Sequence, residues 1–261
     1  MPASTRPEPA PTALGASEAG PAPISPTPGA PEKEAVRSMF DRIAPRYDLL
    51  NRLLSAGTDV RWRRAAVDFL DLRPPLKVLD LCTGTADLLA EAVGRDPGNR
   101  GAGVDLSAAM LARGQGKLGR RGLSQRAALA RGDAERLPFA ESTFTAALVA
   151  FGVRNVGDIE AALREVHRVL APRGRFVVLE FSMPSGPLGA VYRPYFRHVL
   201  PRIGALVSGD AGAYAYLPAS VGRFPEPERF LAAMENAGFR RLARKPLSFG
   251  IACLYRGEKA A

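Results

Sequence analysis

The stretch from Val78 to Leu89 constrains the fold of this chain more than any other. It begins as a short apolar run typical of a buried strand, passes through a turn of small residues, and continues as a helix with apolar periodicity. A strand, a tight turn and a helix in this order form the nucleotide pocket of a doubly wound α/β domain, at the carboxyl end of its first strand. The next predicted strand ends at Asp105, and its separation from Gly84 suits a carboxylate that accepts hydrogen bonds from ribose hydroxyls.

The turn lacks the features of a phosphate site. A dinucleotide fingerprint needs three glycines, whereas this turn contains only Gly84. Asp87 lies in the first turn of the predicted helix, where its charge already uses the positive helix end and repels a phosphate. The sequence therefore predicts a pocket for an adenosine-bearing ligand without phosphates, and S-adenosylmethionine (SAM) is the candidate.

Strands and helices alternate along most of the chain, which predicts an α/β fold with a doubly wound, mostly parallel sheet. Helical patterns precede the first strand, and an aromatic-rich helical insertion or lid is predicted over about 183–224. The last two strands are expected to form an antiparallel pair. Residues 1–31 are rich in Pro and Ala and are predicted to be disordered, because they cannot bury enough apolar surface. One domain is therefore expected over 32–261.

Composition narrows the functional classes. Two cysteines and two histidines predict neither a disulfide framework nor a metal site. No apolar stretch reaches the length of a membrane span, so a cytoplasmic protein is expected. The net charge of +10 fits nucleic-acid binding, contact with an anionic membrane, or an arginine-rich composition without a specific partner.

Five blocks of sequence resemble the quinone-biosynthesis C-methyltransferases, which are class I SAM-dependent enzymes. They are APRYDLLN at 44–51, LDLCTGTADL at 79–88, DAERLPF at 133–139, AFGVRNV at 150–156 and LEFS at 179–182. The resemblance runs from about residue 35 to residue 257. It implies a seven-stranded, Rossmann-like sheet and methylation of the ring of demethylmenaquinol, or of the equivalent ubiquinone precursor. The motifs serve both pathways and do not decide between them.

The resemblance also assigns site residues. The cofactor is expected to contact Asp80, Gly84, Thr85, Asp105, Asp133, Ala134 and Ala150. The active-site positions of the family map to Tyr47, Arg154 and Asn155. Arginine is a poor base, so Arg154 is expected to stabilise the developing phenolate while Tyr47 and Asn155 position the quinol. The general base stays open, with Asp48 and, in the insertion, His198 as candidates.

Two of the departures from the family pattern lie at the expected site. Ala86 replaces the second glycine of the turn, and it is predicted to be tolerated if its backbone already has a right-handed helical φ. Asp59 stands where the family has a histidine, which argues against a histidine base at this position.

Partners follow from the same resemblance. The substrate is expected to carry an isoprenoid tail, and the basic insertion predicts peripheral contact with the inner face of the cytoplasmic membrane. A homodimer is left open. A nucleic-acid methyltransferase is not favoured, because the fourth strand is followed by Ala150-Phe151-Gly152 rather than by the Pro-Pro-aromatic motif of enzymes that methylate base amino groups. A non-catalytic scaffold of a quinone-biosynthesis complex is the remaining alternative.

Overall fold

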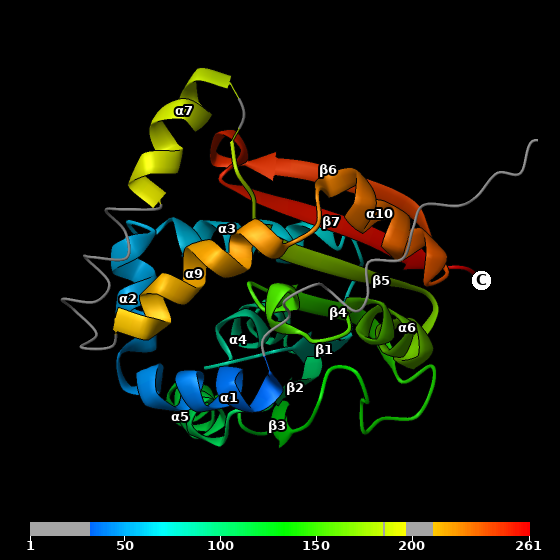
Figure 1. Cartoon of the computed structure of the whole chain (residues 1–261). Coiled ribbons are helices and arrows are strands. Elements are labelled where there is room, and N and C mark those ends of the chain that lie inside the picture. The colour runs from blue at the N-terminus through cyan, green and yellow to red at the C-terminus, as the bar shows by residue number, and fades with distance from the viewer. Residues whose placement is uncertain (1–31, 185, 197–210) are drawn as a thin grey trace, which may run out of the picture.

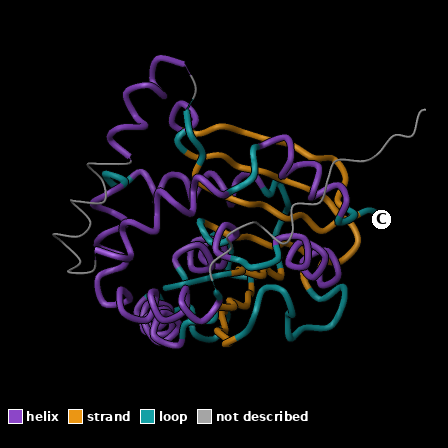
Figure 2. Tube along the Cα trace, in the orientation of Figure 1, coloured by secondary structure: helices purple, strands orange, loops and turns teal. Residues whose placement is uncertain are grey.

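The computed structural model describes residues 32–184, 186–196 and 211–261. The predicted disordered segment 1–31 lies outside the described residues, as does the part of the predicted insertion that contains His198. Figure 1 shows the chain as a sheet with helices packed on it, and Figure 2 separates the strands from the helices in the same view.

A seven-stranded sheet with the order β3-β2-β1-β4-β5-β7-β6 forms the centre of the fold. The strands are β1 (Lys77–Leu81), β2 (Arg100–Asp105), β3 (Ala127–Arg131), β4 (Phe144–Ala150), β5 (Leu170–Phe181), β6 (Phe239–Leu247) and β7 (Ala252–Lys259). The first five are parallel, and β7 pairs antiparallel with both β5 and β6. This order confirms the predicted doubly wound sheet and its closing antiparallel pair.

Helices cover both faces of the sheet, because alternate strand residues point to opposite sides. On one face, Trp62 of α3 (Thr58–Phe69) and Leu88 of α4 (Asp87–Gly94) belong to the apolar cluster that includes Val78. On the other face, Leu163 of α6 (Ile159–Val169) and Met234 of α10 (Pro227–Asn236) share a cluster with Leu79. The parallel strands are thus buried on both sides, which explains their nearly continuous apolar sequences.

The first two helices pack beside the carboxyl ends of the parallel strands. They are α1 (Lys33–Ile43) and α2 (Tyr47–Leu54), joined by a 3₁₀ turn with Pro45 in its first turn. The α1 helix packs on α5 (Ala108–Arg120) and on α9 (Ala211–Arg223), and Figure 1 shows α1, α2 and α9 on the same side of the molecule. The described parts of the predicted insertion are helical, as α7 (Gly186–Pro194) and α9.

The prediction of a right-handed helical backbone at Ala86 is wrong. Ala86 has φ +63° and ψ +27°, which is the left-handed region and not the right-handed helical one. It occupies the N-cap position of α4, where its methyl group can accept no hydrogen bond. Asp80 of β1 acts as the cap instead: its Oδ2 accepts hydrogen bonds from the Leu89 amide at 3.0 Å and from the Thr83 hydroxyl at 2.6 Å. The methyl group of Ala86 is fully buried, in a cluster with Leu89 and Leu118.

The cap carboxylate makes stability depend on pH. Burial raises the pKa of Asp80 to about 7, against the hydrogen bonds from Thr83 and Leu89. Its contribution to the free energy of unfolding is therefore complete below the unfolded pKa of about 4 and is lost as the pH rises to about 7, at up to about 1.4 kcal/mol per pH unit. We expect the stability of the wild type minus that of Asp80→Asn to fall over this range and to level off above it. Urea unfolding at several pH values measures this difference, and a difference that rises with pH would contradict the assignment.

Candidate active site

A cavity opens at the carboxyl ends of β1, β2 and β4, where the strand order reverses direction. Such a switch point is where open α/β sheets bind their ligands. This strand-end cavity is lined by several of the predicted cofactor residues, namely Gly84, Asp105, Asp133, Ala134 and Ala150. The prediction thus selected residues from separate strand ends that lie together in space.

The Asp105 carboxylate is held in place by backbone amides. Its Oδ2 accepts a hydrogen bond from Gly84 at 2.9 Å, and its Oδ1 accepts one from Ser107 at 2.8 Å. Burial raises the pKa of Asp105, and these amide hydrogen bonds oppose the rise. An ionised carboxylate has further lone pairs, so Asp105 can accept hydrogen bonds from two neighbouring hydroxyls of a ribose.

The Asp133 carboxylate is already engaged by α1. Its Oδ2 lies 2.7 Å from the Lys33 ammonium, which also pairs with Glu135 at 2.6 Å. Asp133 Oδ1 accepts the amide hydrogen bond of Glu135 at 3.0 Å. The contact expected between Asp133 and the adenine amine therefore has to share this carboxylate with Lys33. These ion pairs hold the first turn of α1 over the cavity.

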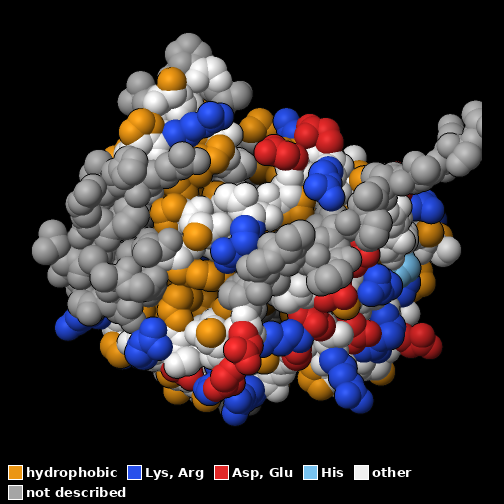
Figure 3. All heavy atoms as spheres, viewed as in Figure 1, with side chains coloured by type: hydrophobic (Ala, Val, Ile, Leu, Met, Phe, Trp, Pro, Cys, Tyr) orange, Lys and Arg blue, Asp and Glu red, His pale blue; other side chains and the backbone are white. Residues whose placement is uncertain are grey.

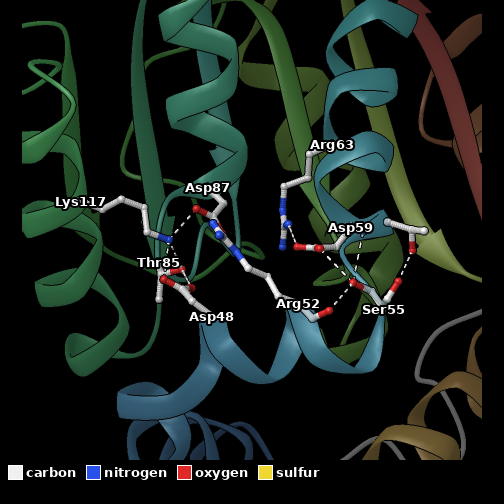
Figure 4. Close-up of polar contacts among 9 residues, drawn as sticks. Asp48, Arg52, Ser55, Asp59, Arg63, Thr85, Asp87 and Lys117 are labelled. Atoms are coloured by element: carbon white, nitrogen blue, oxygen red, sulfur yellow. Dashed lines mark hydrogen bonds and ion pairs between the residues drawn. The ribbon is translucent and has the colours of Figure 1, made fainter.

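Two predicted cofactor residues do not line the strand-end cavity. Asp80 lies beneath it as the cap of α4. Thr85 points away, toward Asp48 and Lys117 (Figure 4): its hydroxyl donates to Asp48 at 2.6 Å and accepts from the Lys117 ammonium at 2.9 Å. The Thr85 hydroxyl is thus engaged by protein groups, and the contact of Thr85 with the cofactor stays a prediction. Only the burial of Lys117 on α5 brings these groups together, and the sequence carries no local signal for it.

The same cluster weakens Asp48 as a candidate base. Lys117 pairs with Asp48 at 2.8 Å and with Asp87 at 2.6 Å, which ties α2 to the start of α4. Burial opposes the charge of Asp48, but the Lys117 ammonium and the Thr85 hydroxyl hold the pKa of Asp48 below its ordinary value. Asp48 lines neither the strand-end cavity nor the second cavity that adjoins it among the N-terminal helices.

A second cavity of about 270 Å³ lies next to the first, among α1, α2, α3, α7 and α9. Much of the surface of this aromatic cavity consists of rings, including those of Trp62, Phe181 and Phe196. The rings of Phe151 and Phe181 stack with their centroids 4.4 Å apart. The strand-end cavity and the aromatic cavity adjoin, because Phe40, Tyr47 and Phe151 line both.

The three predicted catalytic residues surround this junction. Tyr47 lines both cavities, Arg154 lines the aromatic cavity, and Asn155 lines the strand-end cavity. The Asn155 Oδ1 accepts a hydrogen bond from the hydroxyl of Tyr216 on α9 at 2.9 Å. Burial raises the pKa of Tyr47, and its hydrogen bond with Asn51 and the charge of Arg63 oppose this. Tyr47 is therefore a neutral phenol that can donate a hydrogen bond into the junction.

Glu180 on β5 positions Arg154, a role that the sequence motifs did not predict. Its side chain is completely buried, and its Oε1 lies 2.6 Å from Arg154 Nη1 and accepts the amide hydrogen bond of Phe181 at 2.9 Å. Arg154 Nη1 also donates to the carbonyl oxygen of Phe151, and the guanidinium lies 5.4 Å above the ring of Phe181. A carboxylate inside an apolar strand is the signal that could have identified Glu180.

Solved structures share this fold. A SAM-dependent methyltransferase from Thermotoga maritima superposes with a TM-score of 0.59 at 22% identity, over 85% of this chain and 99% of that one. The phosphoethanolamine N-methyltransferase of Haemonchus contortus superposes with a TM-score of 0.62 at 13% identity, over 86% of this chain and 60% of that one. At these identities the likeness concerns the fold alone.

Curated relatives are much more similar in sequence. The demethylmenaquinone methyltransferase of Deinococcus radiodurans is 52% identical over 87% of this chain and 93% of its own length. That of Thermus thermophilus is 50% identical over 85% of this chain and its whole length. A ubiquinone/menaquinone biosynthesis C-methyltransferase from Syntrophotalea carbinolica is also 50% identical, over 85% of this chain and 92% of its own length. The model of one family matches residues 29–259, and the chain belongs to it: it is a SAM-dependent methyltransferase of the ubiE/COQ5 methyltransferase family.

Proposed function

We propose that this enzyme transfers the methyl group of SAM to a ring carbon of demethylmenaquinol, as a step of menaquinone biosynthesis. The observation that carries the proposal is the junction of the two cavities at Phe40, Tyr47 and Phe151. If Asp105 holds the ribose of SAM, the sulfonium methyl group of SAM would lie at this junction. It would face a flat apolar ring held among aromatic side chains. Two relatives at 50–52% identity carry the name demethylmenaquinone methyltransferase.

The roles of the site residues follow from the chemistry. The sulfonium of SAM is already activated, so the protein has to align the ring carbon with the S–CH₃ axis and favour the phenolate form of the quinol. Arg154 carries a guanidinium and lines the aromatic cavity, where its charge can stabilise a developing phenolate. Tyr47 and Asn155 orient the ring at the junction, and Glu180 holds Arg154 in place.

Turnover by the purified full chain tests this function. Incubation with SAM and a short-chain demethylmenaquinol, kept reduced, is expected to yield the ring-methylated quinol and S-adenosylhomocysteine. A methyltransferase that lacks this activity would give no product under conditions in which an active relative turns over. Calorimetry with SAM separates the enzyme from a non-catalytic scaffold, because a scaffold has no need to bind SAM.

The equivalent ubiquinone precursor is the second candidate substrate, since the relative from Syntrophotalea carbinolica is named for both pathways. The two substrates differ in their ring system: the naphthoquinol carries a fused benzene ring that the benzoquinol lacks. Comparing kcat/KM for the two compounds, each at the same tail length, decides between them. We expect the higher value for demethylmenaquinol.

We further propose that the face beside the aromatic cavity rests on the cytoplasmic membrane, where an isoprenoid quinol resides. In the described part of the chain no helix is long and apolar enough to cross a membrane. Large apolar side chains are nevertheless exposed near the cavity: Leu49 is 61% exposed and Leu53 52% on α2, and Phe249 before β7 is 89% exposed. Figure 3 shows hydrophobic and basic side chains close together at the upper left, where α7 lies.

Changing Leu49, Leu53 and Phe249 to glutamine is expected to weaken binding to vesicles with anionic lipid by about tenfold or more. The reason is that less apolar area then enters the membrane surface. Flotation measures the bound fraction. Turnover of a short-chain quinol in solution serves as the control and should change little. Flotation equal to that of the wild type would contradict this orientation.

A further inference from the structure

Asp59 is the one carboxylate among the described residues that line the aromatic cavity. It lies in the first turn of α3 and is only 3% exposed. The other acidic groups near the site do not face this cavity: Glu180 lies beneath Arg154, and Asp48 and Asp87 are held by Lys117. A charged group among aromatic rings is costly to bury, so its presence calls for an explanation.

Two neighbours hold the Asp59 carboxylate in one orientation (Figure 4). Its Oδ1 accepts a hydrogen bond from the Ser55 hydroxyl at 2.9 Å, and its Oδ2 is paired with Arg63 Nη1 one turn further along α3. Ser55 and Arg63 line the same cavity. The carboxylate is thus fixed by contacts on both oxygens and retains lone pairs that can face a ligand in the cavity.

Arg63 stays charged and is no competitor for a proton. Burial opposes its charge, but the carboxylates of Asp87 and Asp59 raise the pKa of Arg63 above its ordinary value. The pair is more than a means of stability, because replacing a buried ion pair by apolar side chains is often neutral or stabilising. A purely structural account therefore gives little reason for a carboxylate at this position.

The proposed reaction requires a group that accepts a proton. A phenol with a pKa of about 10 is mostly neutral at pH 7, and only its anion makes the ring carbon strongly nucleophilic. The other titratable groups of the aromatic cavity are poor acceptors. They are arginines and tyrosines, namely Arg63, Arg154, Tyr47, Tyr192, Tyr195 and Tyr216. A guanidinium is a cation, and a phenol is a weak acid. Burial raises the pKa of Tyr47 and of Tyr216, and that of Tyr192 to about 12.

We propose that Asp59, oriented by Ser55 and Arg63, accepts the hydroxyl proton of the quinol; this inference rests on the proposed function. As the proton passes to the carboxylate, the freed electron pair makes the ring carbon nucleophilic, and the new C–CH₃ bond forms while the S–CH₃ bond breaks. The hydrogen on that carbon then leaves as a proton and the ring oxygen regains one. One proton in total is released to the solvent, and S-adenosylhomocysteine leaves.

The test compares Asp59→Asn with the wild type over a range of pH. Asparagine preserves the shape and can still accept from Ser55, but it cannot take a proton. At pH 7 we expect kcat to fall about 100-fold, which is typical of a lost general base. The deficit should shrink as the pH rises, because hydroxide then generates the phenolate. A quinol made more acidic by a ring halogen should also restore turnover in the variant more than in the wild type.

Asp68→Asn is the matched control, since Asp68 lies on the same helix and its side chain is exposed at an ion pair with Arg95. Its kcat and its pH profile should equal those of the wild type. Calorimetry should give the same SAM affinity for both variants, which separates proton transfer from a loss of structure. If Asp59→Asn does not fold, Asp59→Glu serves instead, because it keeps the carboxylate. This variant should retain part of the activity, and its kcat should be higher with the halogenated quinol than with the parent quinol.

The outcomes are distinct. A deficit in Asp59→Asn that is equal at every pH and for both quinols, or no deficit at all, would overturn the role of Asp59 while leaving the proposed function intact. A wild-type protein that binds SAM but methylates neither quinol would overturn the proposed function, and the role of Asp59 with it.

Discussion

Replacing Glu180 with alanine is expected to lower the free energy of unfolding by about 3–5 kcal/mol. The change leaves the Arg154 guanidinium, whose side chain is almost completely buried, without its carboxylate partner at 2.6 Å. It also removes the acceptor for the Phe181 amide. A buried charge without a counter-charge costs far more than the net value of the intact pair, because the charge has lost its water and no opposite charge replaces it. Turnover should fall as well, since Arg154 loses its fixed position in the aromatic cavity.

Chemical denaturation measures this loss, with Glu228→Ala as the matched control. Glu228 on α10 pairs with Arg244 at 2.8 Å, but both side chains reach the solvent. Removing an exposed pair should cost at most about 1 kcal/mol. If Glu180→Ala were no more destabilising than Glu228→Ala, the pair on β5 would not be the buried anchor that its burial indicates.

Replacing Asp105 with alanine is expected to weaken SAM binding about 100-fold. The Asp105 carboxylate is the group at the end of β2 that can accept from both ribose hydroxyls, and a hydrogen bond to a charged group contributes about 1.5–3 kcal/mol. The change also takes the acceptor away from the amides of Gly84 and Ser107 at the edge of the cavity. The SAM affinity of Asp105→Asn should lie between those of the wild type and Asp105→Ala, because an amide keeps one acceptor oxygen.

Isothermal titration calorimetry with SAM measures the affinity of each variant. The thermal midpoint, recorded without ligand, shows whether the turn has been lost together with the ribose contact. Asp68→Ala on the outer side of α3 removes an acidic group away from both cavities and should bind SAM like the wild type. Equal affinities for Asp105→Ala and Asp68→Ala would remove Asp105 from the cofactor site.

Much of the fold could be predicted from short-range patterns. The helical spacing of Ile159, Leu163 and Val166 predicts the face of α6 that packs on the sheet. The side chains of Ser107 and Asp158 accept amide hydrogen bonds at the starts of α5 and α6, as their positions before helical patterns indicate. Such features depend on neighbours within one or two turns, so the sequence specifies them directly.

The candidate site could be predicted only in part. Residues at the carboxyl ends of parallel strands must meet at one edge of the sheet, which is why Gly84, Asp105 and Asp133 were selected correctly as neighbours. This rule gives the position of each residue and not the direction in which its side chain points. The Thr85 side chain turns away from the strand-end cavity because Lys117, buried on α5, donates to the Thr85 hydroxyl and pairs with Asp48.

The sequence by itself therefore determined the doubly wound sheet and the strand ends at which a cavity lies, because both depend on local periodicity and on the geometry common to parallel sheets. Its motif blocks indicated the family. Only the tertiary structure decided the left-handed backbone of Ala86 and the partnership of Arg154 with Glu180. It also decided that Asp59 faces the aromatic cavity. These depend on which groups lose their water together when distant segments pack. That loss makes the energy of a charge depend on its buried partners rather than on its neighbours in the chain.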